Sequence, residues 1–222
     1  MKELIKLKGV CKFYQMGDSI IKAAHGINVC INAGDFVAIV GPSGSGKSTV
    51  MNLVGALDLA SEGNIFLDGQ DIEHLGESEL AQIRGRKIGF IFQGFNLIPT
   101  LTALENVMLP MLFQKVEKKE RVKRASDLLT QVGLDDRLHH LPGELSGGQR
   151  QRVAIARSLS NDPEVILADE PTGNLDSKTG KEIMKMFREL NKTGKTIIMV
   201  THDLEIAKQA KKIISLKDGQ IE

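Results

Sequence analysis

The most informative stretch of this 222-residue sequence is Gly41-Pro-Ser-Gly-Ser-Gly46-Lys47-Ser48-Thr49. Its first eight residues match the pattern G-x-x-x-x-G-K-[ST], whose glycines let backbone N–H groups approach a phosphate. The apolar run Phe36–Val40 precedes it, and apolar residues at helical spacing follow it, namely Val50, Leu53, Val54 and Leu57. This order predicts a strand, a loop and a helix, which is the local structure in which the pattern binds phosphate.

The residue types in this stretch indicate a nucleotide with a bound metal ion. Lys47 brings a positive charge to the β- and γ-phosphates, and Ser48 offers a hydroxyl to Mg²⁺. The alternative is a glycine-rich turn that binds nothing, which the flanking strand and helix disfavour. The predicted nucleotide-binding residues are Gly41, Pro42, Ser43, Gly44, Ser45, Gly46, Lys47, Ser48 and Thr49.

Composition excludes several other classes of protein. Lys and Arg total 29 against 28 Asp and Glu, a net charge of +1, so a nucleic-acid binder with a broad basic face is not indicated. Two cysteines, Cys11 and Cys30, cannot make a disulfide framework, which favours a reducing compartment. No apolar run approaches the ~18 residues that a transmembrane helix needs.

Short apolar runs alternate with helical patterns along the chain, which predicts an α/β fold with a parallel sheet. Asp68-Gly69 and Asp218-Gly219 lie between strand-like segments, as in antiparallel hairpins. Residues 94–160 contain no strand-like run and are predicted to be mostly helical. The expected buried strands are residues 36–40, 88–92, 165–167, 196–200 and 212–216.

Two carboxylates follow one of these strands, in the run Val165-Ile-Leu-Ala-Asp169-Glu170. Asp169 is placed to hold Mg²⁺ through water, and Glu170 to accept a proton from an attacking water. The alternative is a strand that simply ends in a polar turn, which Pro171 would support. Residues 191–194 have Gly where the guanine-reading N-K-x-D pattern needs Asp, which argues against a GTPase.

The run Leu145-Ser146-Gly147-Gly148-Gln149 predicts a second helix N-terminus suited to an anion. Ser146 is expected to cap a helix over residues 149–159. One nucleotide needs only one phosphate cradle, so this second helix end is free to meet the nucleotide of another subunit. An ordinary glycine-rich helix cap is the alternative.

With these motifs in this order, the chain resembles the ATP-binding subunits of ABC transporters over essentially its whole length. Residues 41–49 resemble Walker A, residues 167–170 the end of Walker B, and residues 145–149 the signature. Four single residues also match positions of the family, although without this context Gln93 and His202 would be ordinary polar residues and Tyr14 edge packing. They are Gln93 as the Q-loop glutamine, Asp176 in the D-loop, His202 as the switch histidine and Tyr14 as the aromatic that stacks on adenine.

The resemblance implies an ATPase in which two copies form a head-to-tail sandwich around two ATP molecules. Glu170, His202 and Gln93 are then the catalytic residues, and Ser48, Gln93 and Asp169 the Mg²⁺ ligands. Gln93 also links the site to a membrane partner. The residues that face the other chain's ATP, or align the two sites, are Ser146, Gly147, Gly148, Gln149 and Asp176.

The implied fold is an α/β P-loop NTPase formed by a single domain with three lobes. Residues 36–60, 86–93 and 161–222 would form a RecA-like parallel-sheet core. Residues 1–35 and 61–75 would form an antiparallel β subdomain, and residues 94–160 a helical subdomain that carries the signature.

Residues 92–107 and the run Pro171-Thr-Gly-Asn-Leu-Asp176 resemble the lipoprotein-release and macrolide-export branch, with LolD- and MacB-like ATPases. That branch serves FtsX-like permeases that move lipoproteins, drugs or peptides. The permease is expected to be a separate polypeptide that holds this chain at the cytoplasmic face of the membrane. Two alternatives stay open: an FtsE-type cell-division module, and a soluble ABC ATPase, which the single cassette without long heptads disfavours.

The loop after Gln93 contains three apolar residues, Phe95, Leu97 and Ile98. They pack within the chain, or they line a docking site for a helix of the permease.

Overall fold

The computed structural model describes residues 2–17 and 19–222, and the chain forms two compact units. The first unit comprises residues 1–84 and 194–222, and the second comprises residues 85–193. Helix α2 (Glu77–Lys87) carries the chain from the first unit into the second.

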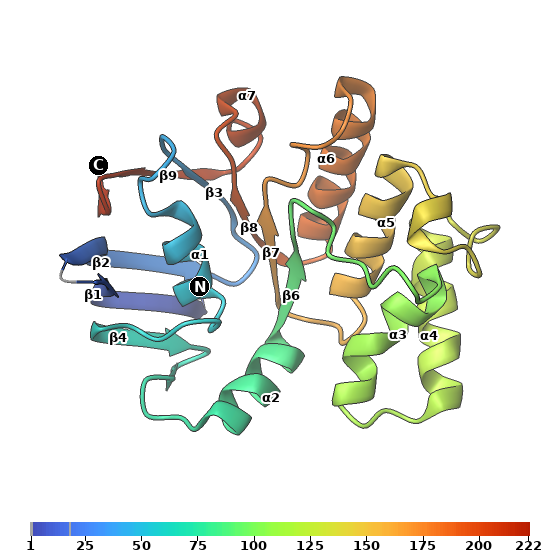
Figure 1. The fold of residues 1–222 in the computed structure, drawn as a ribbon, viewed down its shortest axis with the longest axis horizontal. Coiled ribbons are helices and arrows are strands. Elements are labelled where there is room, and N and C mark those ends of the chain that lie inside the picture. Colours follow the sequence, from blue (N-terminus) through green and yellow to red (C-terminus); the bar gives the residue numbers. More distant parts are fainter. Residues whose placement is uncertain (1, 18) are drawn as a thin grey trace. The chain divides into compact units, whose positions relative to one another are not determined.

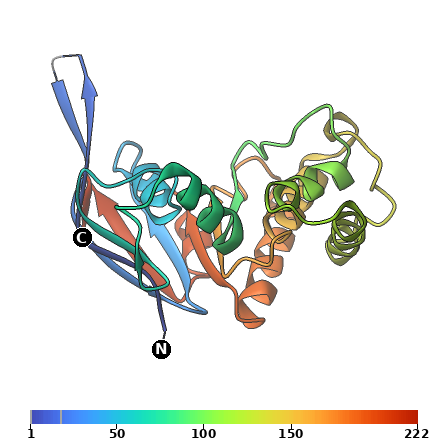
Figure 2. The ribbon, with the colours of Figure 1, turned by 90° about the horizontal axis from the view of Figure 1, so that it is seen from below.

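An antiparallel sheet in the first unit has the strand order β2-β1-β4-β5. Figure 2 shows the paired ends of its two longest strands extending away from the other elements of this unit. Asp68 and Gly69 both have positive φ, 52° and 80°, as a tight hairpin turn requires. The strands are β1 (Glu3–Met16), β2 (Ser19–Asn32), β4 (Glu62–Leu67) and β5 (Gln70–Asp71).

Parallel strands form the other sheet of this unit, with β3 between β9 and β8. Every residue of β3 and β8 is buried, as their unbroken apolar runs predict. Helix α1 packs against β8 and against β1 and β2, and α7 contacts β3. The elements are β3 (Phe36–Val40), β8 (Thr196–Val200), β9 (Lys212–Lys217), antiparallel β10 (Gln220–Ile221), α1 (Lys47–Val54) and α7 (Leu204–Ala207).

The second unit pairs two parallel strands and packs helices beside them (Figure 1). Helix α5 is its central element, because it contacts α3, α4, α6 and β6. Among the described residues 94–160 there is no strand. The elements are β6 (Ile88–Ile91), α3 (Ala103–Phe113), α4 (Lys118–Gln131), a 3₁₀ turn (Pro142–Glu144), α5 (Gly147–Ser158), β7 (Val165–Asp169) and α6 (Ser177–Lys192).

A fully buried asparagine fixes the loop between β6 and α3. The Asn106 side chain accepts from the backbone N–H of Ile98 at 2.8 Å and donates to the carbonyls of Ile98, Leu101 and Thr102. Thr102 and Glu105 form a capping box at the start of α3. The segment that follows Gln93 is therefore an ordered loop.

The predicted α/β class, the N-terminal antiparallel sheet and both Asp-Gly hairpins are confirmed. The signature helix begins at Gly147 instead of Gln149, because Ser146 caps it and both glycines adopt the first helical turn. In the part of the chain that the structure describes, no helix combines the length and apolarity needed to cross a bilayer. Cys11 and Cys30 are both free thiols.

Candidate functional site

Two glycines let the predicted phosphate-binding loop pass close to neighbouring backbone in the first unit. A Cβ on Gly41 would lie 2.2 Å from the carbonyl oxygen of Leu216 at the end of β9. A Cβ on Gly46 would lie 2.3 Å from the carbonyl oxygen of Ala23 in β2, and its φ of +96° also favours glycine. No larger residue fits at either position without moving a strand.

The N-terminus of α1 is open to an anion. Among the described residues no side chain caps this helix, and its first turn contains no acidic residue. The first-turn N–H groups and the helix dipole therefore face outward with partial positive charge. Lys47 donates to the carbonyls of Gly41 and Pro42 at 2.9 and 2.7 Å, so its ammonium lies along the loop. Ser48 is exposed, as a metal-binding hydroxyl must be.

Within the same loop, Ser45 is almost fully buried, and its hydroxyl oxygen has no hydrogen-bond partner among the described residues. Its backbone carbonyl accepts from Gly219 of the β9–β10 turn at 3.1 Å. The turn Asp218-Gly219 of the β9–β10 hairpin therefore anchors the loop by a backbone hydrogen bond.

His202 leaves the sheet next to the phosphate-binding loop. Strands β3 and β8 are parallel neighbours with Ile39 opposite Val200, and Thr201 donates its N–H to the Ile39 carbonyl at 3.1 Å. Carboxyl ends of neighbouring parallel strands meet at one edge of a sheet, where ligands bind in open α/β folds. The exposed His202 and the start of the loop at Gly41 therefore share that edge.

Tyr14 near the end of β1 is held by the ion pair of Lys12 and Asp58, which no sequence pattern predicted. Its hydroxyl donates to Asp58 at 2.9 Å, and Lys12 pairs with the same carboxylate at 2.6 Å. The Lys12 nitrogen also lies 5.2 Å from the centre of the tyrosine ring. Burial, with a smaller effect from Asp58, raises the pKa of the Tyr14 phenol. The ring remains 37% exposed, so it can stack on a planar group.

The other predicted site residues belong to the second unit, where β6 and β7 are parallel neighbours. Ile91 lies opposite Ala168, so Gln93 and Asp169 come at the same edge of this strand pair. Glu170 follows with a φ of +44°, a conformation that costs a non-glycine residue about 1–3 kcal/mol and is common at functional sites. Its carbonyl accepts from Gly173 at 3.0 Å.

The backbone of Gln93 is tied to the segment after Glu170. Asn174 donates its side-chain amide to the Gln93 carbonyl at 2.7 Å. A Cβ on Gly173 would lie 3.3 Å from the side-chain nitrogen of Gln93, so that side chain lies close to this turn. The glutamine and the carboxylate segment thus form one cluster.

The signature forms a capped helix end, as predicted. The Ser146 hydroxyl accepts from Gln149 N–H at 3.2 Å, and the Gln149 side chain accepts from Ser146 N–H at 2.8 Å. No acidic residue lies in the first turn of α5. A Cβ on Gly148 would lie 2.5 Å from a methyl carbon of Thr179, so glycine is required where α5 passes α6.

Asp176 acts as the N-cap of α6. Its carboxylate accepts from the backbone N–H groups of Lys178 and Thr179, both at 3.0 Å, and from the Thr179 hydroxyl at 2.6 Å. These hydrogen bonds, those from Thr179 first, lower the pKa of Asp176. Aspartate is a favoured N-cap residue, so this cap could have been predicted from the helical pattern that follows it in the sequence.

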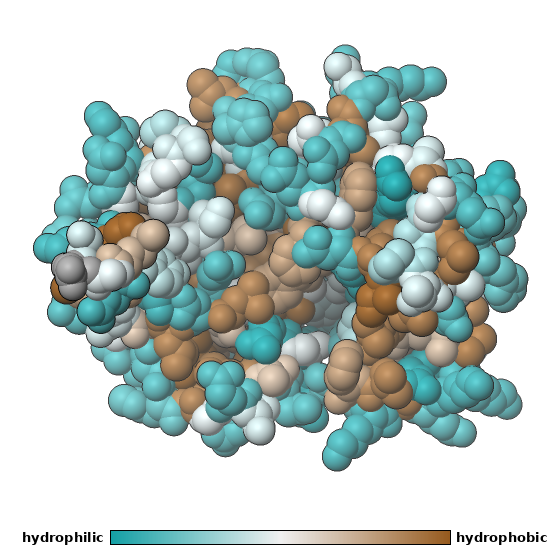
Figure 3. Space-filling model, in the orientation of Figure 1, coloured by the Kyte–Doolittle hydropathy of each residue, from teal (hydrophilic) through white to brown (hydrophobic). Residues whose placement is uncertain are grey.

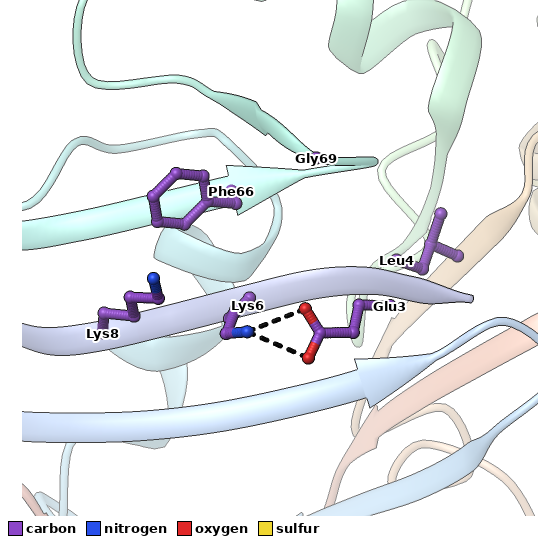
Figure 4. Close-up of a pocket in the computed structure, with 6 residues that line it drawn as sticks. All are labelled: Glu3, Leu4, Lys6, Lys8, Phe66 and Gly69. Atoms are coloured by element: carbon purple, nitrogen blue, oxygen red, sulfur yellow. Dashed lines mark hydrogen bonds and ion pairs between the residues drawn. The ribbon is translucent and has the colours of Figure 1, made fainter. Parts of the chain in front are cut away.

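A separate hollow of about 190 Å³ opens on the antiparallel sheet of the first unit (Figure 4). Its Lys6 is bonded to both oxygens of Glu3, and Lys8 lies 5.1 Å from the centre of the Phe66 ring. None of the predicted site residues lines it. The lining residues are Glu3, Leu4, Lys6, Lys8, Phe66 and Gly69.

Comparison with known proteins identifies the family. The family model described as ABC transporter matches residues 24–173. An uncharacterized ABC transporter ATP-binding protein of Thermotoga maritima is 52% identical over 222 residues, covering 100% of this chain and 95% of that protein. The chain belongs to the ABC transporter family. It is an ATP-binding cassette of that family, with the activity of an ATPase.

Two further relatives refine the comparison for this cassette. The macrolide export ATP-binding/permease protein MacB of Bdellovibrio bacteriovorus is 53% identical over 219 residues, which are 99% of this cassette and 33% of that protein. A cassette of Methanocaldococcus jannaschii, solved as a dimer in a post-hydrolysis state with ADP and Pi, superposes with a TM-score of 0.91. It is 51% identical, and the match covers 99% of this cassette and 97% of that chain. The LolD/MacB-like branch is thereby confirmed.

Replacement of Lys47 tests the phosphate-binding loop of the cassette. Lys47→Ala removes a charged hydrogen-bond donor worth about 1.5–3 kcal/mol. The affinity for ATP should fall about 10- to 150-fold, measured by equilibrium binding of a fluorescent ATP analogue. Lys8→Ala, in the hollow of Figure 4, is the control and should bind normally. Unchanged affinity in Lys47→Ala would refute the assignment of the loop.

Proposed function

We propose that this cassette works as a homodimer that closes on two ATP molecules and drives a separately encoded FtsX-like permease, which exports a lipoprotein, drug or peptide. One observation carries the proposal. Among the described residues, α1 and α5 both have a glycine-flanked N-terminus without an acidic residue in the first turn, and one ATP needs only one such helix end. The M. jannaschii relative, solved as a dimer, supports a pairing in which α5 serves the other chain's nucleotide.

In this proposal the residues of each chain have distinct functions at the phosphates of the ATP. The loop amides and Lys47 bind the β- and γ-phosphates, and His202 contacts the γ-phosphate. Glu170 accepts the proton of the attacking water, and its positive φ is a backbone strain of the kind found at functional sites. Mg²⁺, which neutralises phosphate charge when bound, would be held by Ser48, Asp169 and Gln93, whose oxygen atoms suit it.

Tyr14 completes the nucleotide site by stacking on the adenine ring, for which its exposed ring and fixed hydroxyl are suited. Across the dimer, Ser146, Gly147, Gly148 and Gln149 face the phosphates of the other chain's ATP. Asp176 aligns the two sites through the N-terminus of α6.

A permease would hold the cassette at the cytoplasmic face of the membrane. Phe95 and Leu97 are half-buried, but Ile98 is 38% exposed, and at the end of α3 Leu112 and Phe113 are 50% and 66% exposed. Figure 3 shows hydrophobic residues gathered over α3. An exposed apolar surface of this kind suits a docking helix. The MacB relatives, which join such a cassette to a permease, favour export over an FtsE-type role.

Removal of the proposed base tests the chemistry and the dimer together. Glu170→Gln keeps the shape of the side chain but cannot take a proton, so hydrolysis should fall roughly 10²–10⁴-fold. Because ATP binding survives, ATP should trap a dimer that light scattering detects. Glu189→Gln, on the exposed face of α6, should hydrolyse ATP normally and form no trapped dimer. A Glu170→Gln variant that stays monomeric in saturating ATP counts against the sandwich.

A charge placed on the apolar loop tests the docking surface. Ile98→Asp should abolish co-purification with a co-expressed FtsX-like permease, because docking would bury the carboxylate without a partner. Val122→Asp on α4 is the matched control, since Val122 is also 38% exposed. Both variants should melt and bind ATP like the parent chain. Normal co-purification of Ile98→Asp would remove this loop from the interface.

A further inference from the structure

The turn after Gln93 has a backbone conformation that its residues do not favour. Phe95 and Asn96 are consecutive non-glycine residues with φ of +61° and +48°. Asparagine tolerates the left-handed region, but phenylalanine rarely enters it. The local hydrogen bonds, Phe95 N–H to the Phe92 carbonyl at 3.0 Å and Asn96 N–H to the Gly94 carbonyl at 2.7 Å, only close the turn. Contacts from outside the turn must therefore hold it.

Those contacts come from the signature helix. The half-buried guanidinium of Arg157 donates to the Phe95 carbonyl at 2.8 Å and to the adjacent Asn96 carbonyl. The rigid, planar fork of N–H groups of a guanidinium sets the relative position of two carbonyls that it binds, whereas the donors of an ammonium rotate freely. Burial lowers the pKa of Arg157, but a guanidinium still carries its proton at neutral pH.

Arg150 makes a second contact from the same helix. It precedes Arg157 by two helical turns and therefore lies on the same face of α5. Its guanidinium carbon lies 5.3 Å from the centre of the Phe95 ring, within the range of a cation–π contact. The ring and both carbonyls of the strained turn are thus engaged by one helix face.

The turn also determines where Gln93 lies. Asn174 holds the Gln93 carbonyl on one side, and Arg157 holds the carbonyls two and three residues further on. The backbone of the glutamine is therefore fixed at both ends of a four-residue segment. Helix α5, which begins at the signature, supplies one of these two anchors.

We propose that Arg157, assisted by Arg150, is a positioning residue that holds the turn at residues 95–96 in its left-handed conformation and so fixes Gln93 to the signature helix. Movement of α5 at its N-terminus is then transmitted to Gln93 through its arginines. The inference rests on the proposed function only for the catalytic role of Gln93. The anchoring of the turn stands on the contacts alone.

Hydrogen exchange tests the anchoring in the intact chain. Arg157→Gln should speed exchange of the amides of residues 94–98 by about tenfold or more, because the turn opens more often. Arg157→Lys, which keeps a charged donor but lacks the rigid fork, should give a smaller increase. Arg152→Gln is the matched control: Arg152 is also half-buried on α5, but it contacts the Val132 carbonyl and Glu182. Unchanged exchange in folded Arg157→Gln, or an equal rise in Arg152→Gln, overturns the proposal.

A double-mutant cycle on ATPase rate tests whether Arg157 acts through Gln93. If it does, Arg157→Gln lowers the rate in the parent chain but lowers it no further in Gln93→Ala. Independent effects that multiply would contradict the positioning role. If Arg157→Gln does not fold, as thermal melting would reveal, Arg157→Lys enters the cycle in its place.

Together, hydrogen exchange and the double-mutant cycle distinguish a failure of this inference from a failure of the proposed function. A Gln93→Ala variant with the parent ATPase rate would show that the glutamine is not catalytic, and so overturn the link from Arg157 to catalysis. The exchange rates of residues 94–98 would then still confirm or refute the anchored turn.

Discussion

The absence of a side chain at Gly41 and Gly46 is the constraint on which the first unit depends. At these two positions the phosphate-binding loop passes so close to the backbone of β9 and β2 that a Cβ would collide with a carbonyl oxygen. In the proposed site, the same absence lets the loop amides converge on a phosphate at the start of α1. One steric requirement would then join the packing of the strands to the binding of the nucleotide.

The order of the strands in the parallel sheet places His202 next to that loop. Because β3 and β8 are parallel neighbours, the loop and His202 leave the sheet at the same edge. Tyr14 comes from a different sheet and needs its own support, which Asp58 and Lys12 give through paired hydrogen bonds. The parallel sheet thus fixes the loop and His202 of the proposed site, and a polar cluster fixes Tyr14.

The second unit is organised by α5 in a comparable way. Its N-terminus carries the signature, its arginines hold the turn after Gln93, and Gln151 donates to the Pro171 carbonyl beside Glu170. A single helix therefore contacts each segment to which a catalytic role is assigned in this unit. The strained turn at residues 95–96 and the segment after Glu170 both accept hydrogen bonds from side chains of α5.

Elements whose structure is determined by a local sequence pattern could be predicted from the sequence. Buried strands such as Phe36–Val40 follow from unbroken apolar runs, and the turn at Asp218-Gly219 follows from its need for positive φ. The Walker A loop and the Ser146 cap were predictable for the same reason. The long strands β1 and β2 were not delimited, because bulges interrupt their alternation of apolar and polar residues.

Contacts between residues that are far apart in the sequence could not be predicted from sequence patterns. Asp58 meets Tyr14 across 44 positions, and Arg157 meets Phe95 across 62, so no periodicity records either pair. The left-handed conformations of Phe95 and Glu170 were also unpredictable, because neither residue type favours them. Only the fold brings together the groups that enforce such conformations.

In the proposed dimer each ATP is hydrolysed by residues of two chains, and mixing two inactive variants tests this shared site. Lys47→Ala lacks a working phosphate loop, and Ser146→Arg lacks a working signature. A heterodimer of the two contains one complete site, whereas neither homodimer contains any. The ATPase rate should therefore peak at equimolar mixing and exceed that of both variants. A rate that changes linearly with the mixing ratio, or full activity in Ser146→Arg alone, would show that the two chains do not share a site.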